Sequence, residues 1–373
     1  MTPKKLLLLS LSAGSGHVRA AEAIRKTAAE LYPSLDVVHK DMAEFMSTPV
    51  KTAIITSYDI LVKQLPELWG YLYKKTDDPS RVKRFQKISA FTNRMDAHDL
   101  YTFVSSFVPD RILCTHFLPA QSLISASKKY AFPAPSLLMT DYDKHVFLTH
   151  PGIKEYFVAT KKMKFKLMDS GIPEGKLHIT GIPVDPVFYA KKEITTLRKT
   201  YGIDGKNPVL LVMAGGQGFV NIHDLITSLF SLTTPVTIIA IAGNNPSLRK
   251  KVERLTPPRH ISVQAVGWTD AVDEYMRIAD MIITKPGGMT TTECIALGKP
   301  ILAMHPIPGQ EEQNAQYILE HDLGYVARDR FDLLYYTNLI LSEKRKQNAV
   351  PGIPAAQRIL KHLLSSSSAP DRD

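Results

Sequence analysis

The sequence predicts an α/β protein made of two doubly wound domains, each built on a parallel sheet flanked by helices. The chain has 373 residues, which suits two domains of about 150 to 200 residues each. Short apolar runs alternate with longer amphipathic segments, as in repeated βαβ units. This pattern restarts after a proline-rich stretch at residues 181–186, so the second half should form its own sheet.

The expected strands are short and apolar. In the first half they cover residues 6–11, 36–39, 111–114, 135–140 and 155–159, with a helix at 17–31 and a mostly helical insertion at 58–107. In the second half they cover residues 209–213, 236–242, 261–265, 281–284 and 301–304. Ligands bind beyond the carboxyl ends of parallel strands, so function is expected in the loops after strands, in a cleft between the two sheets.

We assign residues 1–185 to an N-terminal domain and residues 186–345 to a C-terminal domain. Residues 346–373 should contain a closing helix at 355–364, followed by a serine-rich polar tail that we expect to be disordered.

The composition favours an anionic partner and a reducing compartment. Lys and Arg outnumber Asp and Glu by 46 to 36, a net charge of +10, which suits phosphate, nucleotide, nucleic acid or acidic lipid. Cys114 and Cys294 are the two cysteines, and their apolar neighbours indicate core residues rather than a disulfide. No apolar run reaches the roughly 18 residues that cross a bilayer, so membrane contact should be peripheral.

The loop at residues 12–17, Ser-Ala-Gly-Ser-Gly-His, joins the first strand to a helix. Small residues at a helix start let backbone N–H groups approach an anion. His17 would project from that start into the cleft, where a neutral imidazole can take a proton from a hydroxyl group. Capping of the helix is an equally weighted interpretation from spacing alone.

Three loops of the second half place polar or glycine-rich segments before helices. Residues 214–219 are suited to a diphosphate, although taken alone a tight turn that needs glycine is favoured. Residues 284–293 lead into a helix in which the carboxylate of Glu293 could accept hydrogen bonds from ribose hydroxyls, or simply face the helix dipole. Residues 306–314 carry an amide and carboxylates that suit sugar hydroxyls, or a capping loop.

Together these motifs resemble a known family. The run at residues 285–314 resembles the nucleotide-sugar signature of the glycosyltransferases that include the lipid II-forming N-acetylglucosaminyl transferase and the monogalactosyldiacylglycerol synthases. Residues 12–23, 140–145 and 150–152 resemble the N-terminal domain of galactosyl- and glucosyl-diacylglycerol synthases. The resemblance implies a GT-B fold with two Rossmann-like domains and inverting transfer from UDP-glucose or UDP-galactose to diacylglycerol. Leu148 stands where relatives often carry an aromatic residue, which bears on acceptor specificity.

The resemblance also implies roles for individual residues. His17 matches the active-site histidine, with Asp141 and His116 as candidates for orienting it or serving as the base. Glu293 would bind ribose, and Gln310 and Glu311 the hexose. The remaining donor-binding residues would hold the uracil and the diphosphate: Gly16, Gly215, Gly216, Gln217, Gly218, Val266, Gly267, Trp268, Thr269, Gly287, Gly288, Met289 and Thr290.

A basic and aromatic stretch at residues 50–95 is the expected membrane and acceptor surface, although a solvated helical face would explain any single residue. Its key members are Trp69, Tyr71, Lys74, Lys75, Arg81, Lys83 and Arg84. The expected location is the cytoplasmic face of a cell membrane. No cofactor is expected, and no sequence spacing indicates a metal site.

Two alternatives remain open at this point. The chain could transfer N-acetylglucosamine to a polyprenyl-linked acceptor, which uses a similar second domain. It could also be a non-catalytic sensor of nucleotide sugars at the membrane, which would tolerate loss of His17 but not of Glu293. A nucleic-acid partner is not expected because the sequence carries no reader motif.

Overall fold

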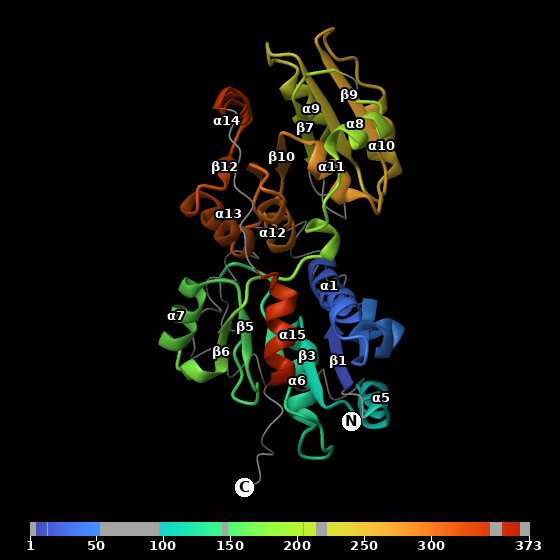
Figure 1. Ribbon diagram of the computed structural model, residues 1–373, viewed down its shortest axis with the longest axis vertical. Coiled ribbons are helices and arrows are strands. Elements are labelled where there is room, and N and C mark those ends of the chain that lie inside the picture. The colour runs from blue at the N-terminus through green and yellow to red at the C-terminus, as the bar shows by residue number, and fades with distance from the viewer. Residues whose placement is uncertain are drawn as a thin grey trace. The chain divides into compact units, whose positions relative to one another are not determined.

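The computed structural model describes residues 5–12, 14–52, 97–143, 148–203, 205–213, 222–343 and 353–365. They form two compact units, each with its own six-stranded parallel sheet (Figure 1). The first unit comprises Met1–Pro186, Pro308–Gln310 and Gly352–Asp373, and the second comprises Val187–Ile307 and Glu311–Pro351. The predicted fold class, two doubly wound α/β domains, is therefore confirmed.

The first sheet has the strand order β2-β1-β3-β4-β5-β6. Its strands are β1 (Lys5–Ser10), β2 (Asp36–Asp41), β3 (Arg111–Cys114), β4 (Ser136–Leu138), β5 (Tyr156–Val158) and β6 (Leu177–Ile179). Its helices are α1 (Ser15–Leu31), α5 (His98–Phe107), α6 (Phe117–Ala126), α7 (Lys161–Asp169) and α15 (Ala355–Ser365). The predicted strands of this half all appear, within a few residues at their ends.

The second sheet has the strand order β12-β11-β10-β7-β8-β9. Its strands are β7 (Val209–Met213), β8 (Val236–Ile241), β9 (Ile261–Val266), β10 (Met281–Thr284), β11 (Ile301–Met304) and β12 (Gly324–Ala327). Its helices are α8 (Ile194–Thr200), α9 (Ile222–Leu229), α10 (Pro246–Glu253), α11 (Val272–Ile278), α12 (Gly288–Leu297), α13 (Gln310–Glu320) and α14 (Arg330–Glu343). Counted along the chain this is the 3-2-1-4-5-6 order of a dinucleotide-binding fold.

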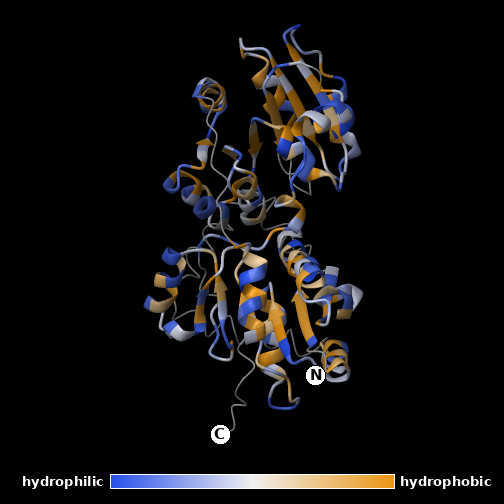
Figure 2. Cartoon of the chain, viewed as in Figure 1, coloured by the Kyte–Doolittle hydropathy of each residue, from blue (hydrophilic) through white to orange (hydrophobic). Residues whose placement is uncertain are grey.

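Continuous apolar runs produce the strands because a parallel sheet covered by helices is buried on both faces. In β1 the four leucines Leu6–Leu9 are at most 2% exposed, and all five residues of β7 are buried. Figure 2 shows the same pattern, with mostly hydrophobic strands and helices that contain both hydrophilic and hydrophobic residues. The core of each unit combines buried strand side chains with buried side chains of the flanking helices.

Two strands were not predicted, because neither carries a long apolar run. β6 holds the exposed Ile179 and the partly exposed His178, and β12 starts with Gly324, whose φ is +154°. Both are edge strands, which pair with a neighbouring strand on one side only.

The C-terminal helix α15 belongs to the first unit, although it follows the whole second unit in sequence. It contacts α1, and Figure 1 shows it beside the strands of the first sheet. The side of α15 that faces this unit is apolar, with Ala356, Ile359, Leu360 and Leu363 buried. The sequence predicts this helix but not the part of the chain that it packs on.

No helix in the described part of the chain is long and apolar enough to cross a membrane. The expected membrane residues Trp69, Tyr71, Lys74, Lys75, Arg81, Lys83 and Arg84 lie outside the described residues.

Candidate active site

The first candidate site lies where the direction of chain winding changes in the first sheet. β1 is flanked by β2 on one side and by β3 on the other, and ligands of doubly wound sheets bind beside the loops that leave the strands at such a point. Leu9 of β1 pairs with Cys114 of β3, and the Thr115 N–H donates to the Leu9 carbonyl at 2.9 Å. The segment after β3 is thereby held beside the start of α1.

His17 is the third residue of α1 and is fixed by Thr115. Its Nδ1 lies 2.5 Å from the backbone carbonyl of Thr115, and the Thr115 hydroxyl donates to the backbone carbonyl of His17 at 2.9 Å. A carbonyl can only accept, so Nδ1 must carry a proton. In the neutral ring Nε2 then holds the free lone pair, which is the form needed by a general base.

The electrostatic surroundings keep that ring neutral. Burial lowers the pKa of His17 below its ordinary value near 6.5, while the negative charge of Asp141 and the bond to Thr115 oppose this effect. Thr140 Oγ1 lies 3.3 Å from Nδ1 as a second, weaker neighbour. At neutral pH the imidazole is therefore neutral, with its proton on Nδ1, and Nε2 can accept a second proton.

His116 is a poorer candidate for the base. Its Nδ1 accepts the N–H of Leu118 at 3.1 Å and so caps α6. Burial, reinforced by His17, lowers its pKa well below 6.5. The two histidine rings meet edge to face, with centroids 4.7 Å apart. This arrangement favours His116 as a packing partner that limits the movement of His17.

A serine–histidine–glutamate chain nearby supports α1 rather than performing chemistry. Ser10 Oγ lies 2.8 Å from His39 Nε2, and His39 Nδ1 lies 2.5 Å from Glu22 Oε1. Ser10 is 0% exposed, so no substrate can reach it as a nucleophile. Because Glu22 lies on α1, His39 on β2 and Ser10 on β1, the chain of contacts fixes the helix that carries His17.

One helix start in each unit lacks a side-chain cap. α1 follows Gly14, whose φ of +124° suits glycine, and α12 follows Gly287. Neither helix has a side-chain cap or an acidic residue in its first turn. In α12 the first helical bond runs from the Thr291 N–H to the Gly287 carbonyl, which leaves the preceding N–H groups without a helical acceptor.

The second candidate site follows β10, at the point where the winding of the second sheet reverses between β7 and β10. Lys285 Nζ lies 3.9 Å from Glu311 Oε2, and burial lowers the pKa of Lys285 below its ordinary value. Glu311 Oε2 also accepts the Ile307 N–H at 2.8 Å, which ties the loop before α13 to the first turn of this helix.

The other predicted donor-binding residues lie around the same sheet. Glu293 is on the second turn of α12 and 1% exposed, and Gly288 and Met289 are buried beside it. Thr290 and Gly287 are partly exposed. Gln310 begins α13.

The residues proposed for uracil follow the edge strand β9. Val266 ends this strand, Gly267 is partly exposed, and Trp268 is 61% exposed. Thr269 accepts the Ala271 N–H at 3.1 Å. The diphosphate residues Gly215, Gly216, Gln217 and Gly218 lie outside the described residues.

Comparison with known families matches both halves of the chain. Residues 17–184 match the monogalactosyldiacylglycerol (MGDG) synthase family, and residues 209–334 match the glycosyltransferase family 28 C-terminal domain. The chain therefore combines an MGDG synthase domain with a family 28 glycosyltransferase C-terminal domain. Its MGDG synthase domain holds His17, Thr115 and Asp141, and its family 28 domain holds Lys285, Glu293 and Glu311.

Full-length relatives are similar along most of the chain. A processive diacylglycerol beta-glucosyltransferase of Bacillus pumilus is 29% identical, over 93% of this chain and 89% of its own length. The Bacillus subtilis protein of the same name is 27% identical, over 92% and 88%.

Solved structures share the fold at low sequence identity. Acinetobacter baumannii MurG superposes with a TM-score of 0.62 at 14% identity, covering 97% of this chain and all of that one. A UDP-GlcNAc 2-epimerase from Neisseria meningitidis, bound to UDP-GlcNAc, gives 0.61 at 14% identity with the same coverage. These similarities establish the GT-B-like architecture of the glycosyltransferase.

One feature of the MGDG synthase domain could not be found from the sequence. The group that orients His17 is a backbone carbonyl, that of Thr115, and a backbone carbonyl leaves no signature in residue type. Asp141, which was proposed for this role, raises the pKa of His17 through its charge.

Proposed function

We propose that this glycosyltransferase transfers glucose from UDP-glucose to the hydroxyl group of diacylglycerol, with inversion at the anomeric carbon and His17 as the general base. The single observation that carries the mechanism is the bond from His17 Nδ1 to the Thr115 carbonyl, which leaves Nε2 free to take a proton. Similarity to proteins named diacylglycerol beta-glucosyltransferases supports the substrates.

The acceptor hydroxyl oxygen forms a bond to the anomeric carbon, the bond from that carbon to the diphosphate oxygen breaks, and the hydroxyl proton moves to His17 Nε2. UDP leaves as the anion. An uncapped helix start such as that of α12 would stabilise its charge without a metal ion or other cofactor.

The choice of sugar rests on the relatives. The N-terminal domain family is named for galactosyl transfer, whereas the full-length relatives are named for glucosyl transfer. Similarity over more than nine tenths of the chain is the stronger argument, so glucose is proposed ahead of galactose.

Contact with the membrane is proposed to involve α7 as well as the stretch at residues 50–95. Phe165 follows Lys161 by four residues and Lys162 by three, and it precedes Met168 by three, so these side chains lie on the same side of the helix. Phe165 is 70% exposed and Met168 is 38% exposed, beside exposed lysine side chains. Such a face places an apolar ring in the bilayer interface and lysines beside anionic headgroups.

The test is transfer of radiolabelled sugar from UDP-glucose and from UDP-galactose into lipid, using vesicles of diacylglycerol and anionic phospholipid. Wild type should form labelled glycolipid from UDP-glucose, and His17→Ala should reduce the rate by about 10²- to 10⁴-fold. His223→Ala, which alters an exposed histidine of α9, is the matched control and should keep full activity.

Donor binding distinguishes the alternatives. Binding of UDP without transfer to diacylglycerol would contradict the proposal and favour a polyprenyl-linked acceptor or a sensor. Transfer that persists in His17→Ala would leave the substrate assignment standing and refute the role of the histidine.

A further inference from the structure

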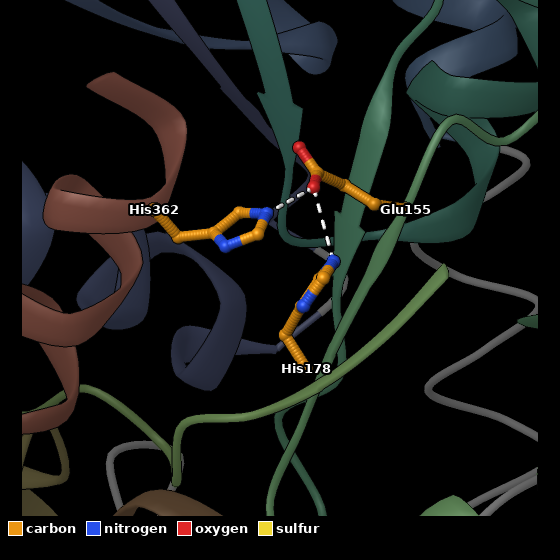
Figure 3. Close-up of side chains that lie close together, drawn as sticks. All are labelled: Glu155, His178 and His362. Atoms are coloured by element: carbon orange, nitrogen blue, oxygen red, sulfur yellow. Dashed lines mark hydrogen bonds and ion pairs between the residues drawn. The ribbon is translucent and has the colours of Figure 1, made fainter. Parts of the chain in front are cut away.

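Three side chains of the first unit converge on one point away from the residues assigned to catalysis. Glu155 immediately precedes β5, His178 lies in β6, and His362 lies in α15 (Figure 3). Glu155 Oε2 is 3.2 Å from His178 Nε2 and 2.6 Å from His362 Nε2. One ligand atom from each residue lies within 4.8 Å of the other two. His362 is 207 positions from Glu155 in sequence, so only the fold brings them together.

The donor set and its spacing suit a tetrahedral metal ion. Two imidazole nitrogens and a carboxylate oxygen are ligands of Zn²⁺ at about 2.0–2.2 Å, which places neighbouring ligand atoms roughly 3.3 Å apart. The distance of 3.2 Å between Glu155 and His178 already matches this spacing. The distance of 2.6 Å between Glu155 and His362 would have to open by about 0.7 Å to do so.

The charges of the cluster also favour a cation. The two imidazole rings lie with centroids only 3.7 Å apart, so two imidazolium ions there would repel each other. In the absence of a metal ion, the Glu155 carboxylate accepts a hydrogen bond from the Nε2–H of each ring. A metal ion would take the Nε2 lone pairs instead, with the proton of each ring on Nδ1, and would balance the charge of the carboxylate.

Neighbouring protein groups support one side of the cluster, and the other side faces solvent. Glu155 is 5% exposed, and its second oxygen, Oε1, accepts the Ser136 hydroxyl at 3.0 Å, which fixes the carboxylate plane. Phe157 packs against both histidine rings, at 5.7 and 5.6 Å between centroids. The histidine side chains are 24% and 31% exposed, which leaves a solvent-facing side for entry and for a water ligand.

We infer that Glu155, His178 and His362 bind a divalent transition-metal ion of the zinc class, which fastens α15 to the β5–β6 edge of the first sheet. The site lies apart from the proposed proton acceptor His17 and does not depend on the proposed substrates. The role of this metal ion is to stabilise the packing of the C-terminal helix α15 on the first unit.

The experiment uses the full-length protein, freed of metal with a chelator and titrated calorimetrically with ZnCl₂ at neutral pH. Wild type should bind one equivalent, and CoCl₂ should give the visible absorption bands of tetrahedral Co²⁺. Loss of a ligand should weaken binding by at least about 100-fold, since loss of a mere supporting group costs up to that much. His362→Ala and Glu155→Gln are the ligand variants, and His223→Ala on α9 should bind like wild type.

Hydrogen exchange gives a second readout that does not depend on activity. Zn²⁺ should slow amide exchange in residues 355–365 of wild type but not of Glu155→Gln, which preserves the size of the side chain. His178→Gln gives an independent test should His362→Ala loosen the helix. Equal Zn²⁺ affinity in wild type and in all three ligand variants, or no binding by wild type, would overturn the inference.

Discussion

His17 and Thr115, which are 98 positions apart in sequence, are joined by a hydrogen bond of 2.5 Å from an imidazole nitrogen to a backbone carbonyl. The bond selects the tautomer of the ring, because the carbonyl offers no proton. Any residue at position 115 would keep the backbone carbonyl, so the selection of the His17 tautomer does not depend on the side chain at this position. The effect of this bond on proton transfer can be tested by varying the pH and by removing the charge of a neighbouring residue.

The first prediction concerns the pH dependence of transfer. The base must be unprotonated, so kcat should fall as pH drops through the pKa of His17, which burial holds below 6.5. The negative charge of Asp141 raises that pKa, so Asp141→Asn should move the acidic limb to lower pH. The plateau should also fall, because a weaker base takes the proton less readily. Profiles of kcat from pH 4.5 to 8 measure both effects.

Asp143→Asn is the control, because this neighbouring carboxylate pairs with Lys166 at 2.6 Å. A limb that stays in place in Asp141→Asn would refute the electrostatic coupling. Complete loss of activity in Asp141→Asn, with His17→Ala still active, would identify Asp141 as the base.

The second prediction separates donor binding from chemistry. Glu293 is buried in α12, and its carboxylate is proposed to accept hydrogen bonds from ribose. Hydrogen bonds to charged groups contribute about 1.5–3 kcal/mol, so Glu293→Gln should weaken UDP binding roughly 10- to 100-fold. Calorimetry with UDP measures this, and Glu312→Gln on the exposed side of α13 is the control. Unchanged UDP affinity in Glu293→Gln would remove the residue from the donor site.

The elements of the fold were largely predictable, whereas the site geometry was not. Runs such as Leu6–Leu9 can only be strands buried on both faces, and they were located to within a residue or two. β6 was missed because its three residues include an exposed isoleucine and a histidine, so no hydrophobic pattern marks it. His17 could be singled out from its loop, but the tautomer depends on the register of β1 against β3.

The cluster of Glu155, His178 and His362 could not be predicted from the sequence either. Metal motifs are recognised by short spacings within one element, and none occurs here. The three residues meet because α15 returns to the first unit after the second unit is complete. Nothing in residues 355–365 alone shows which surface they cover, since an apolar helix face can pack on either domain.

The third prediction concerns the support of α1. His39→Ala should leave the buried Ser10 hydroxyl and one Glu22 oxygen without their partner, at a cost of about 1–3 kcal/mol in the free energy of unfolding. Urea unfolding, followed by a probe in the first unit, measures the change. His321→Ala alters an exposed histidine, and its effect should stay within about 0.5 kcal/mol. Equal stability of the two variants would mean that the chain of contacts does not support the helix.

The fourth prediction tests α7 as a membrane contact. Transfer of a phenylalanine side chain from water contributes about 1.5–3 kcal/mol when it is fully buried, and partial insertion should yield less. Phe165→Asp should therefore weaken binding to vesicles of anionic phospholipid about tenfold, as measured by co-sedimentation. Phe331→Asp on α14 is a matched control, because Phe331 is 79% exposed but lies in the second unit. Equal binding of both variants and wild type would exclude α7 from the membrane surface, while selective loss in Phe165→Asp with unchanged UDP affinity would place lipid contact on this helix.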